Sequence, residues 1–393
     1  MREVFGIIIG IGIAYLIALT LALAYKLFAP RFRPLNNRVG ERSAKGDGFE
    51  NADFLPSISV LKPVTGVDGN LRENLLSFIN QDYPDFEIII GVQSADDPAI
   101  KLVEQLKEEF PSRRIQLVIS NHTLGFNPKV NNLYGMMPSA KYDFMVISDS
   151  NVIVGNDYLK ANIGYFRNPK VGLVSNLIKG IGGDTAGALF ENLHLNSFVI
   201  ANVSIAEIVI KRKIVVGKSI FFRRSQFDEM GGLWELRNYL AEDYLMGMLY
   251  EQNGYEVVIS PYLISTANHA WSMKRFINRH TRWSQLRWKL DKPAYIAELF
   301  ANFPLWFLAY LIASGFSYES CIIGTLCWTA KATGDSLMNS MLKSELTFRQ
   351  CLVAPFKDML LGLLWIVPLV NRKTSWRGKS VKIARKTLLL PTD

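Results

Sequence analysis

The chain has 393 residues, which is enough for one large domain or two of ordinary size. A hydrophobic content of 49% is close to that of soluble proteins and excludes a fully embedded transporter and a disordered chain, but it allows a soluble domain with a few membrane helices. The net charge of +9 favours anionic partners: phosphates, nucleic acid or an anionic membrane surface. The three cysteines are too few for a disulfide framework and lack the spacing of a zinc site, so we expect them to be packing residues.

The first apolar segment lies at the N-terminus. No charged residue occurs between Val4 and Tyr25, and a helix of this length crosses the roughly 30 Å hydrocarbon core of a membrane. A cleaved signal peptide is the alternative, since Ala22-Leu23-Ala24 resembles a cleavage site, but the apolar run is longer than in such signals. The positive-inside rule places Lys26 and the basic residues after it in the cytoplasm. We therefore expect a membrane anchor over residues 1–28 and a basic juxtamembrane segment and linker over 29–55.

Residues 56–292 have the pattern of a water-soluble α/β domain. Apolar runs predict strands at Ser57–Leu61, Phe86–Val92, Gln116–Ser120, Phe144–Ser148, Val216–Phe222 and Glu256–Ser260. Helices are predicted at Asn70–Asn80 and at Ala99–Phe110, the second ending before Pro111. Alternating strands and helices indicate a parallel sheet covered on both faces, in which ligands bind beyond the carboxyl ends of the strands.

The C-terminal part is again apolar. Leu299–Tyr318 has no charge and predicts a membrane span, and the apolar stretch Ser320–Ala330 follows it but is interrupted by charged residues. Met359–Val370 is too short to cross alone, so we expect it to complete a span that begins earlier. The basic tail over 372–393 is expected in the cytoplasm, which requires an even number of crossings within 293–371; we expect two.

Polar side chains with catalytic potential follow several predicted strands. Asp96-Asp97 comes after the strand at 86–92, and Asp149-Ser150-Asn151 comes after the strand at 144–148. Glu242-Asp243 opens a helical stretch, and Arg279-x-x-Arg282-Trp283 lies close to the C-terminal apolar segments. Each motif alone has an ordinary explanation as a helix cap, a turn or an interfacial anchor.

Together these motifs indicate a more specific chemistry. Two acidic strand ends at one sheet edge bring carboxylates together, which favours a Mg²⁺ or Mn²⁺ ion that also bridges phosphate oxygens. Arg279, Arg282 and Lys129 could balance the rest of a diphosphate, and Asp243 could act as the base for an incoming hydroxyl. The sequence has no Walker loop and no G-x-G-x-x-G motif, so an ATPase or a Rossmann dehydrogenase loses its main support. The pattern predicts transfer from a nucleotide diphosphate donor.

A series of short motifs runs in order from about Leu61 to Trp288. They are Leu61-Lys62-Pro63, Gly66-Val67-Asp68, Gln81-Asp82-Tyr83-Pro84, Asp96-Asp97-Pro98, Asn127-Pro128-Lys129, Asp149-Ser150, Ala241-Glu242-Asp243-Tyr244 and Arg279-x-x-Arg282-Trp283. In these motifs the chain resembles the ceramide glucosyltransferases, within the wider inverting class that includes cellulose and hyaluronan synthases. The resemblance implies an α/β fold: a GT-A (Rossmann-like) nucleotide-sugar transferase domain with an N-terminal transmembrane anchor and C-terminal membrane helices.

The resemblance also implies roles for single acidic residues. Asp96 matches the family aspartate that contacts the nucleotide, and Asp149 matches the aspartate of a reduced Asp-x-Asp metal motif, so a divalent cation (Mn²⁺ or Mg²⁺) is implied. Asn151 replaces the second acid of that motif, which leaves the cation dependent on Asp149 and the donor phosphates. Asp243 matches the catalytic base, with Glu242 beside it in a positioning role.

Other matching positions concern the donor. The residues implied in donor binding are Lys62, Pro63, Asp96, Lys129, Ser150, Arg279, Arg282 and Trp283. Arg279 stands where processive polymer synthases usually have Gln, which fits the branch that makes a single transfer to a lipid. His194 lies where the family also carries a histidine; alone it would be interpreted as structural, and with the resemblance it is a candidate site residue, as is Glu242.

The resemblance implies an inverting transferase that moves a hexose from a UDP-sugar to the hydroxyl of a membrane lipid, with UDP-glucose and ceramide expected to give glucosylceramide. A hopanoid polyol that receives N-acetylglucosamine stays an alternative, because residues 174–180 differ from the eukaryotic pattern. A processive polysaccharide synthase and an inactive membrane scaffold are further alternatives. We expect a UDP-sugar, a lipid and a membrane as partners, no nucleic acid, and a bacterial inner-membrane protein with a cytoplasmic catalytic domain.

Overall fold

The computed structural model describes residues 2–29, 54–67, 70–371, 373–376 and 379–391. The chain forms two compact units. We call Leu27–Ile178 with Lys211–Ala267 the sheet unit, and Met1–Lys26 with Lys179–Ile210 and Asn268–Asp393 the helical unit. Most of the expected linker, residues 30–53, lies outside the described part of the chain.

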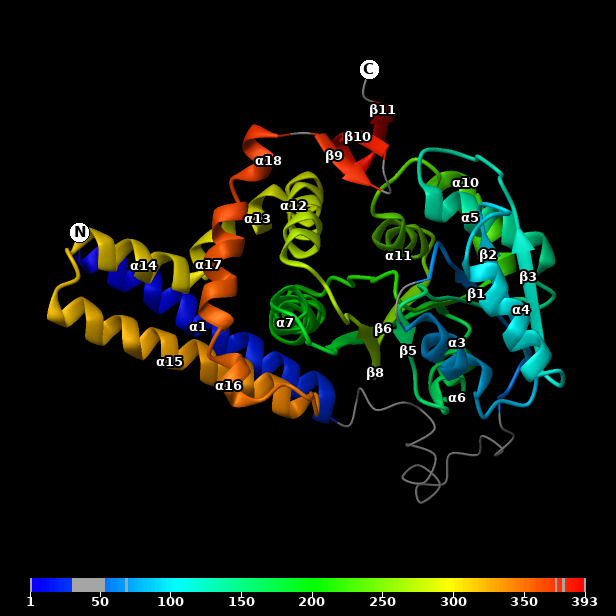
Figure 1. Ribbon diagram of the computed structural model, residues 1–393, viewed down its shortest axis with the longest axis horizontal. Coiled ribbons are helices and arrows are strands. Elements are labelled where there is room, and N and C mark those ends of the chain that lie inside the picture. Colours follow the sequence, from blue (N-terminus) through cyan, green and yellow to red (C-terminus); the bar gives the residue numbers. More distant parts are fainter. Residues whose placement is uncertain (1, 30–53, 68–69, 372, 377–378, 392–393) are drawn as a thin grey trace. The chain divides into compact units, whose positions relative to one another are not determined.

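The sheet unit is built on an eight-stranded sheet with the order β3-β2-β1-β4-β7-β6-β8-β5. Its parallel half consists of β1 (Ile58–Pro63), β2 (Phe86–Val92), β3 (Arg114–Ile119) and β4 (Phe144–Ile147), of which β1, β2 and β3 are seen side by side in Figure 1. The helices α3 (Leu71–Ile79), α4 (Ala99–Glu109) and α5 (Pro128–Met136) connect these strands. Every side chain of β2 is buried, as its continuous apolar run predicts for a central parallel strand. The strands and helices predicted in this half are confirmed.

The second half of the sheet is antiparallel, so the prediction of a wholly parallel sheet was wrong. Strand β7 (Ile220–Arg223) runs antiparallel to β4 and to β6 (Val171–Ile181). Strand β8 (Glu256–Ala267) runs antiparallel to β5 (Val152–Ile153). The alternation of apolar runs indicates which segments are strands, but it carries no information about the direction in which a late strand enters the sheet.

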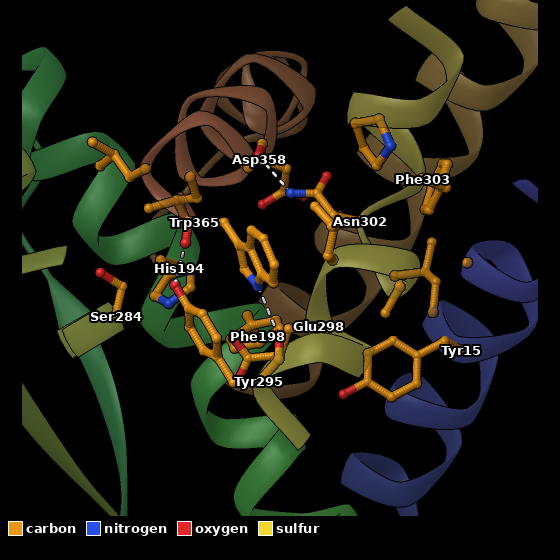
Figure 2. Close-up of a pocket in the computed structure, with 18 of the residues that line it drawn as sticks. Tyr15, His194, Phe198, Ser284, Tyr295, Glu298, Asn302, Phe303, Asp358 and Trp365 are labelled. Atoms are coloured by element: carbon orange, nitrogen blue, oxygen red, sulfur yellow. Dashed lines mark hydrogen bonds between the residues drawn. The ribbon is translucent and has the colours of Figure 1, made fainter. Parts of the chain in front are cut away.

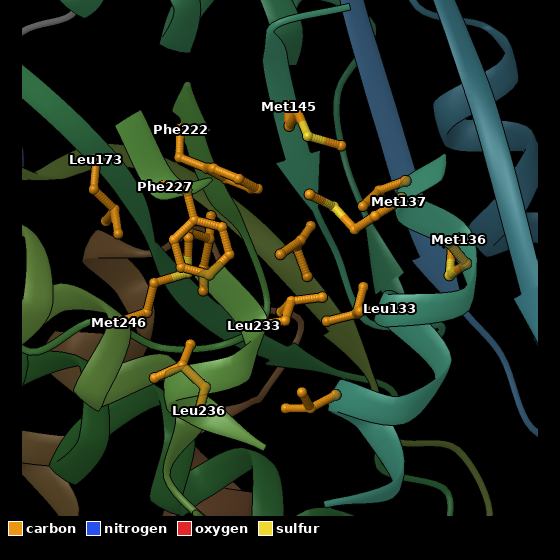
Figure 3. Packing of buried hydrophobic residues seen from close by; sticks show 14 of the residues in the cluster. Leu133, Met136, Met137, Met145, Leu173, Phe222, Phe227, Leu233, Leu236 and Met246 are labelled. Atoms are coloured by element: carbon orange, nitrogen blue, oxygen red, sulfur yellow. The ribbon is translucent and has the colours of Figure 1, made fainter. Parts of the chain in front are cut away.

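One hydrophobic core fixes the two helices that carry the candidate site. Leu133 and Met136 of α5 pack in the same cluster as Met246 of α11 (Glu242–Gln252) and Phe222 of β7 (Figure 3). Phe222 also makes an edge contact with Phe227, with ring centroids 5.3 Å apart. Because such cores are close-packed, the first turns of α5 and α11 are held in a defined position against the sheet.

The helical unit contains α1 (Arg2–Phe28) and a long helical segment formed by α7 (Ala186–Leu193), the π-helical η6 (His194–Val199), α8 (Ile200–Ile205) and η7 (Ala206–Ile210). Further along the chain come α12 (Met273–Leu290), α13 (Lys292–Ala301), α14 (Phe303–Ala313), α15 (Tyr318–Met341), α16 (Phe348–Cys351), α17 (Ala354–Leu364) and α18 (Val367–Val370). Among the described residues, three helical stretches are long and apolar enough to cross a membrane: Arg2–Phe28, Ala186–Ile210 and Phe348–Val370. A fourth candidate is the pair α13 and α14, bent by 52°.

The structure differs from the prediction in two apolar segments. Ala186–Ile210 lies inside the range 56–292 expected for the soluble domain, and it belongs to the helical unit together with residues 268–292. Its polar side chains lower the hydropathy of the segment, and many of them are buried, which hides the span from a search for uncharged runs. Leu299–Tyr318 is not one straight helix, because α13 ends at Ala301 and the next residue, Asn302, caps α14 by accepting from Leu305 N.

The charged residues after Ser320 do not interrupt the helix there. Helix α15 continues through Lys331 and Asp335, which form a 2.6 Å ion pair one turn apart. Lys331 also lies 3.0 Å from Asp358 of α17. The expected completion of a span by Met359–Val370 agrees with the candidate Phe348–Val370.

The basic tail contains a small antiparallel sheet that the sequence did not indicate. Its strands are β9 (Lys373–Trp376), β10 (Lys379–Ile383) and β11 (Leu389–Pro391). These strands are too short for an alternation of apolar and polar residues to predict them, and the sequence of the tail indicates only its positive charge.

Candidate active site

Asp149 lies at the carboxyl end of β4 and is bound by two lysines. Lys129 Nζ is 2.9 Å from Asp149 Oδ1, and Lys218 Nζ is 3.0 Å from Asp149 Oδ2. Burial alone would raise the pKa of the Asp149 carboxyl, but the two ammonium groups outweigh it and hold this pKa well below its ordinary value. Asp149 is therefore ionised throughout the physiological range.

Lys129 occupies the centre of this cluster. The Asn127 side chain caps α5 by accepting from the backbone N–H groups of Lys129 and Val130, which fixes the first turn of the helix. Lys129 Nζ also lies 3.1 Å from Glu242 Oε1, and Glu242 Oε2 accepts from Asn127 Nδ2 at 3.1 Å. Burial would lower the pKa of Lys129, but the neighbouring carboxylates of Asp149, Glu242 and Asp243 raise it, so the lysine stays charged.

Asp243 lies in the first turn of α11, as expected, and is held by two backbone groups. Its Oδ2 accepts from Gly217 N at 2.6 Å, and its Oδ1 accepts from Tyr244 N at 2.8 Å. Burial and the adjacent Glu242 carboxylate raise the pKa of Asp243 to about 6. A carboxylate with this pKa is mostly ionised at neutral pH and still has useful proton affinity, which suits a general base.

Gly217 allows this arrangement because it has no side chain. A Cβ at this position would lie 2.9 Å from both Asp243 Oδ2 and Lys129 Nζ. Lys129 Nζ also donates to Gly217 O at 3.2 Å, so the backbone of this one residue contacts both the candidate base and the central lysine.

Lys62, Pro63 and Ser150 are the other residues near the ends of β1 and β4 that were predicted to bind the donor. Lys62 is wholly buried and donates to Asp149 O at 2.7 Å, and burial lowers its pKa well below the ordinary value. Pro63 is the buried last residue of β1, and Ser150 offers its backbone oxygen to Asn74 Nδ2. Lys62 therefore ties β1 to the end of β4 in this structure, and a contact with the donor remains a prediction for all three.

Asp96 is exposed on the loop after β2. Among the described residues, no hydrogen bond or ion pair joins its carboxylate to the cluster around Asp149. The neighbouring Asp97 has a structural role, since its carboxylate accepts from Gly66 N and from Ala99 N at the start of α4.

A divalent cation does not fit the cluster in this arrangement. Both oxygens of Asp149 contact lysine ammonium groups, and Asn151 Oδ1, at the place of the second acid of the motif, accepts from Lys218 Nζ at 2.6 Å. Over the described part of the chain, no group of three or more Asp, Glu, His or Cys residues is placed to hold a metal ion. The positive charge at this site is supplied by Lys129 and Lys218, and a cation would have to displace them from Asp149.

The remaining predicted residues belong to the helical unit. Arg279 lies on α12 with its guanidinium carbon 4.3 Å from the ring centre of Trp283, and its Nε is 3.3 Å from Glu191 Oε1. His194 is buried at the start of η6, with its ring centre 6.5 Å from that of Trp283. Arg282 lies on the same helix and is half-buried. The structure thus gathers Lys129, Asp149, Glu242 and Asp243 in one unit, and Arg279, Trp283 and His194 in the other.

Sequence reasoning missed Lys218 and Gly217. Both lie in the run Val216–Phe222 that was predicted as a strand, whereas β7 begins only at Ile220. The available signal was the Gly-Lys pair itself, because a glycine and a cation ahead of a buried apolar run indicate a turn at the strand end.

Comparison with known proteins gives the family. The model of glycosyl transferase family 21 matches residues 17–389. Ceramide glucosyltransferase 3 from Caenorhabditis elegans is 27% identical over 404 residues, covering 99% of this chain and 84% of that protein. Ceramide glucosyltransferase from Komagataella phaffii is 40% identical over 113 residues, covering 28% of this chain and 22% of that protein. A solved structure of mannosyltransferase PcManGT from Pyrobaculum calidifontis, in complex with GDP-Man and Mn²⁺, has a TM-score of 0.48 at 16% identity and covers 89% of this chain and 99% of that one.

The family match extends over nearly the whole chain, and it confirms the resemblance inferred from the motifs. With the α/β sheet and the candidate membrane helices at both ends, it also confirms the predicted GT-A transferase fold class and the assignment as an enzyme. The protein is a membrane-associated glycosyltransferase and belongs to glycosyl transferase family 21.

Proposed function

We propose that the protein transfers a hexose with inversion from a UDP-sugar to the hydroxyl of a membrane lipid, with UDP-glucose as the donor and ceramide as the acceptor. The observation that carries the proposal is the Asp243 carboxylate, whose pKa is raised to about 6 and which is held beside Lys129 at the edge of the sheet. The names of the relatives from Caenorhabditis elegans and Komagataella phaffii support the choice of donor and acceptor.

Each member of the cluster has a distinct task in this reaction. Asp243 accepts the proton of the lipid hydroxyl as that oxygen attacks the anomeric carbon from the face opposite the leaving diphosphate. Lys129 and Lys218 supply positive charge to the leaving diphosphate, and such preorganised charge is commonly the largest contribution to transfer reactions. Glu242 positions Lys129 through its 3.1 Å ion pair and does not act on the substrate.

The donor contacts of Asp96, Arg279, Arg282 and Trp283 are part of this proposal, and they are suggested by the matching motifs. The divalent cation implied by the Asp149 motif is a separate prediction. The present contacts of Asp149 do not support it, and no step of the proposed reaction depends on it. We also propose that the protein resides in a bacterial inner membrane with the sheet unit in the cytoplasm, and the basic residues that follow α1 support the cytoplasmic side.

The proposal is tested by incubating the purified full-length protein with radiolabelled UDP-glucose or UDP-N-acetylglucosamine and with ceramide or a hopanoid polyol. Labelled glucosylceramide is the expected product. A labelled hopanoid would show the alternative acceptor, a water-soluble polymer would indicate a processive synthase, and no turnover with any pair would contradict the proposal.

A further inference from the structure

A cavity lies within the helical unit, and its wall combines apolar and polar side chains. It is lined by residues from α1, η6, α12, α13, α14, α15 and α17, and the aromatic rings of Phe198, Tyr295 and Trp365 form part of the wall (Figure 2). Tyr295 and Trp365 stack with ring centres 5.3 Å apart and exchange hydrogen bonds through their backbone oxygens. Three of the lining elements, α1, η6 and α17, belong to the candidate membrane spans. This position makes the cavity a candidate binding site for a membrane lipid.

The charged groups of the wall are paired with one another. Arg287 Nε lies 3.0 Å from Glu298 Oε2, and Lys331 Nζ lies 3.0 Å from Asp358 Oδ2. Each cation that lines the cavity thus has a carboxylate partner. A charged head group that binds one of these side chains would have to compete with its partner, and breaking the mostly buried Lys331–Asp358 pair is unfavourable. The wall therefore favours an uncharged guest.

His194 is a polar side chain of the wall with unused hydrogen-bonding capacity on both ring nitrogens. It is 3% exposed, and neither Nδ1 nor Nε2 has a hydrogen-bond partner among the described residues. Its ring is fixed by stacking on Phe198, with centres 4.9 Å apart, and by the perpendicular ring of His280 at 4.6 Å. Buried polar atoms rarely lack a partner, so the two on this ring are available to the hydrogen-bonding group of a ligand.

The neighbours of His194 are consistent with a neutral ring. His280 Nε2 contacts Glu191 Oε2 at 2.9 Å, and burial lowers the pKa of His280 in spite of that carboxylate. A neutral imidazole has one donor and one acceptor nitrogen, which is complementary to a hydroxyl or an amide. His194 also opens the π-helical segment η6, and such segments occur frequently at functional sites.

We propose that this cavity binds the uncharged, hydroxyl-bearing end of a membrane lipid, with His194 as its hydrogen-bonding partner. Binding requires neither the sugar donor nor turnover, so the inference extends beyond the proposed function. That the bound lipid serves as the acceptor rests on the proposed function.

The test measures lipid binding to the full-length protein in detergent, without donor, by native mass spectrometry. The probes are short-chain ceramide, dioctanoylglycerol and dioctanoyl phosphatidic acid. The first two are expected to bind, and phosphatidic acid is expected to bind at least about tenfold more weakly. This comparison uses the unaltered protein and does not depend on any variant. Equal or tighter binding of phosphatidic acid would overturn the proposal.

Variants then test His194 itself. His194→Phe keeps the aromatic contacts and removes both nitrogens, and it should weaken binding of the neutral lipids about tenfold, as the loss of hydrogen bonds in a buried site predicts. His194→Gln restores a donor and an acceptor and should stay within a few-fold of the parent. His122→Phe, an exposed position in the sheet unit, is the matched control and should change nothing. Unchanged binding by His194→Phe at an unchanged melting temperature would overturn the proposal.

The two proposals fail in different ways. Neutral-lipid binding without any sugar transfer would contradict the proposed function and leave the lipid site standing. Sugar transfer by a protein that shows no preference for neutral lipids would contradict the lipid site and leave the proposed function standing.

Discussion

Asp243 and Gly217 are joined by a 2.6 Å hydrogen bond from the backbone N–H of the glycine to the carboxylate. The glycine lies in the turn before β7, and the aspartate lies in the first turn of α11. This contact orients one oxygen of the candidate base while the same glycine accepts a hydrogen bond from Lys129.

Gly217→Ala should lower turnover by roughly tenfold to a hundredfold, because an added Cβ at 2.9 Å would displace Asp243 or Lys129, and a misplaced reacting group commonly costs this much. The measurement is kcat with a UDP-sugar and a lipid acceptor. Gly10→Ala is the control, since a Cβ there meets no atom of the described structure within 4 Å. Equal activity of the Gly217 variant and the control would contradict the assigned role of the glycine.

Lys218→Met should weaken the binding of UDP several-fold or more, because it removes one of the two positive charges that flank Asp149. Calorimetric titration with UDP gives the dissociation constant directly. Lys160→Met removes the same charge from a surface pair with Asp82 and should have little effect. If the two substitutions weaken UDP binding equally, Lys218 does not face the donor.

Removal of divalent ions tests whether UDP binding needs a cation at Asp149. We expect UDP binding to persist within a few-fold in excess chelator, because both oxygens of Asp149 already contact lysine ammonium groups and need no cation. The assay is the same titration with and without chelator, followed by addition of Mn²⁺ or Mg²⁺. Loss of binding in chelator and recovery with the ion would establish the cation that the sequence motif predicts.

The pH dependence of kcat/KM reports the pKa of the base in the free enzyme. Asp243 must be deprotonated to accept a proton, so kcat/KM should be level at neutral pH and fall as the pH drops below about 6. Glu242→Gln removes the like charge that helps to raise this pKa, and the acidic limb should then move to lower pH. A limb that stays in place in the Glu242 variant would mean that another group titrates.

The sequence predicted those parts of the site that follow from local patterns. The bounds of β2 and the positions of Asp149 and Asp243 could be inferred because a strand end and a helix start have local signatures. The partners of these residues could not be inferred from the sequence, since Lys218 reaches Asp149 only through the antiparallel pairing of β4 with β7. The membrane-length helix at 186–210 was hidden for a similar reason, because its polar residues are satisfied or buried by tertiary contacts that hydropathy does not record.

The role of Asp243 as the base is the central claim, and the substitution Asp243→Asn tests it most directly. Asparagine keeps the size of the side chain and caps a helix well, but it cannot accept the proton. Turnover should fall by roughly 10²–10⁴ while the dissociation constant for the UDP-sugar stays within a few-fold, because the base acts on the acceptor hydroxyl. Turnover within about threefold of the parent at unchanged melting temperature would contradict the account, since the loss of a general base costs far more.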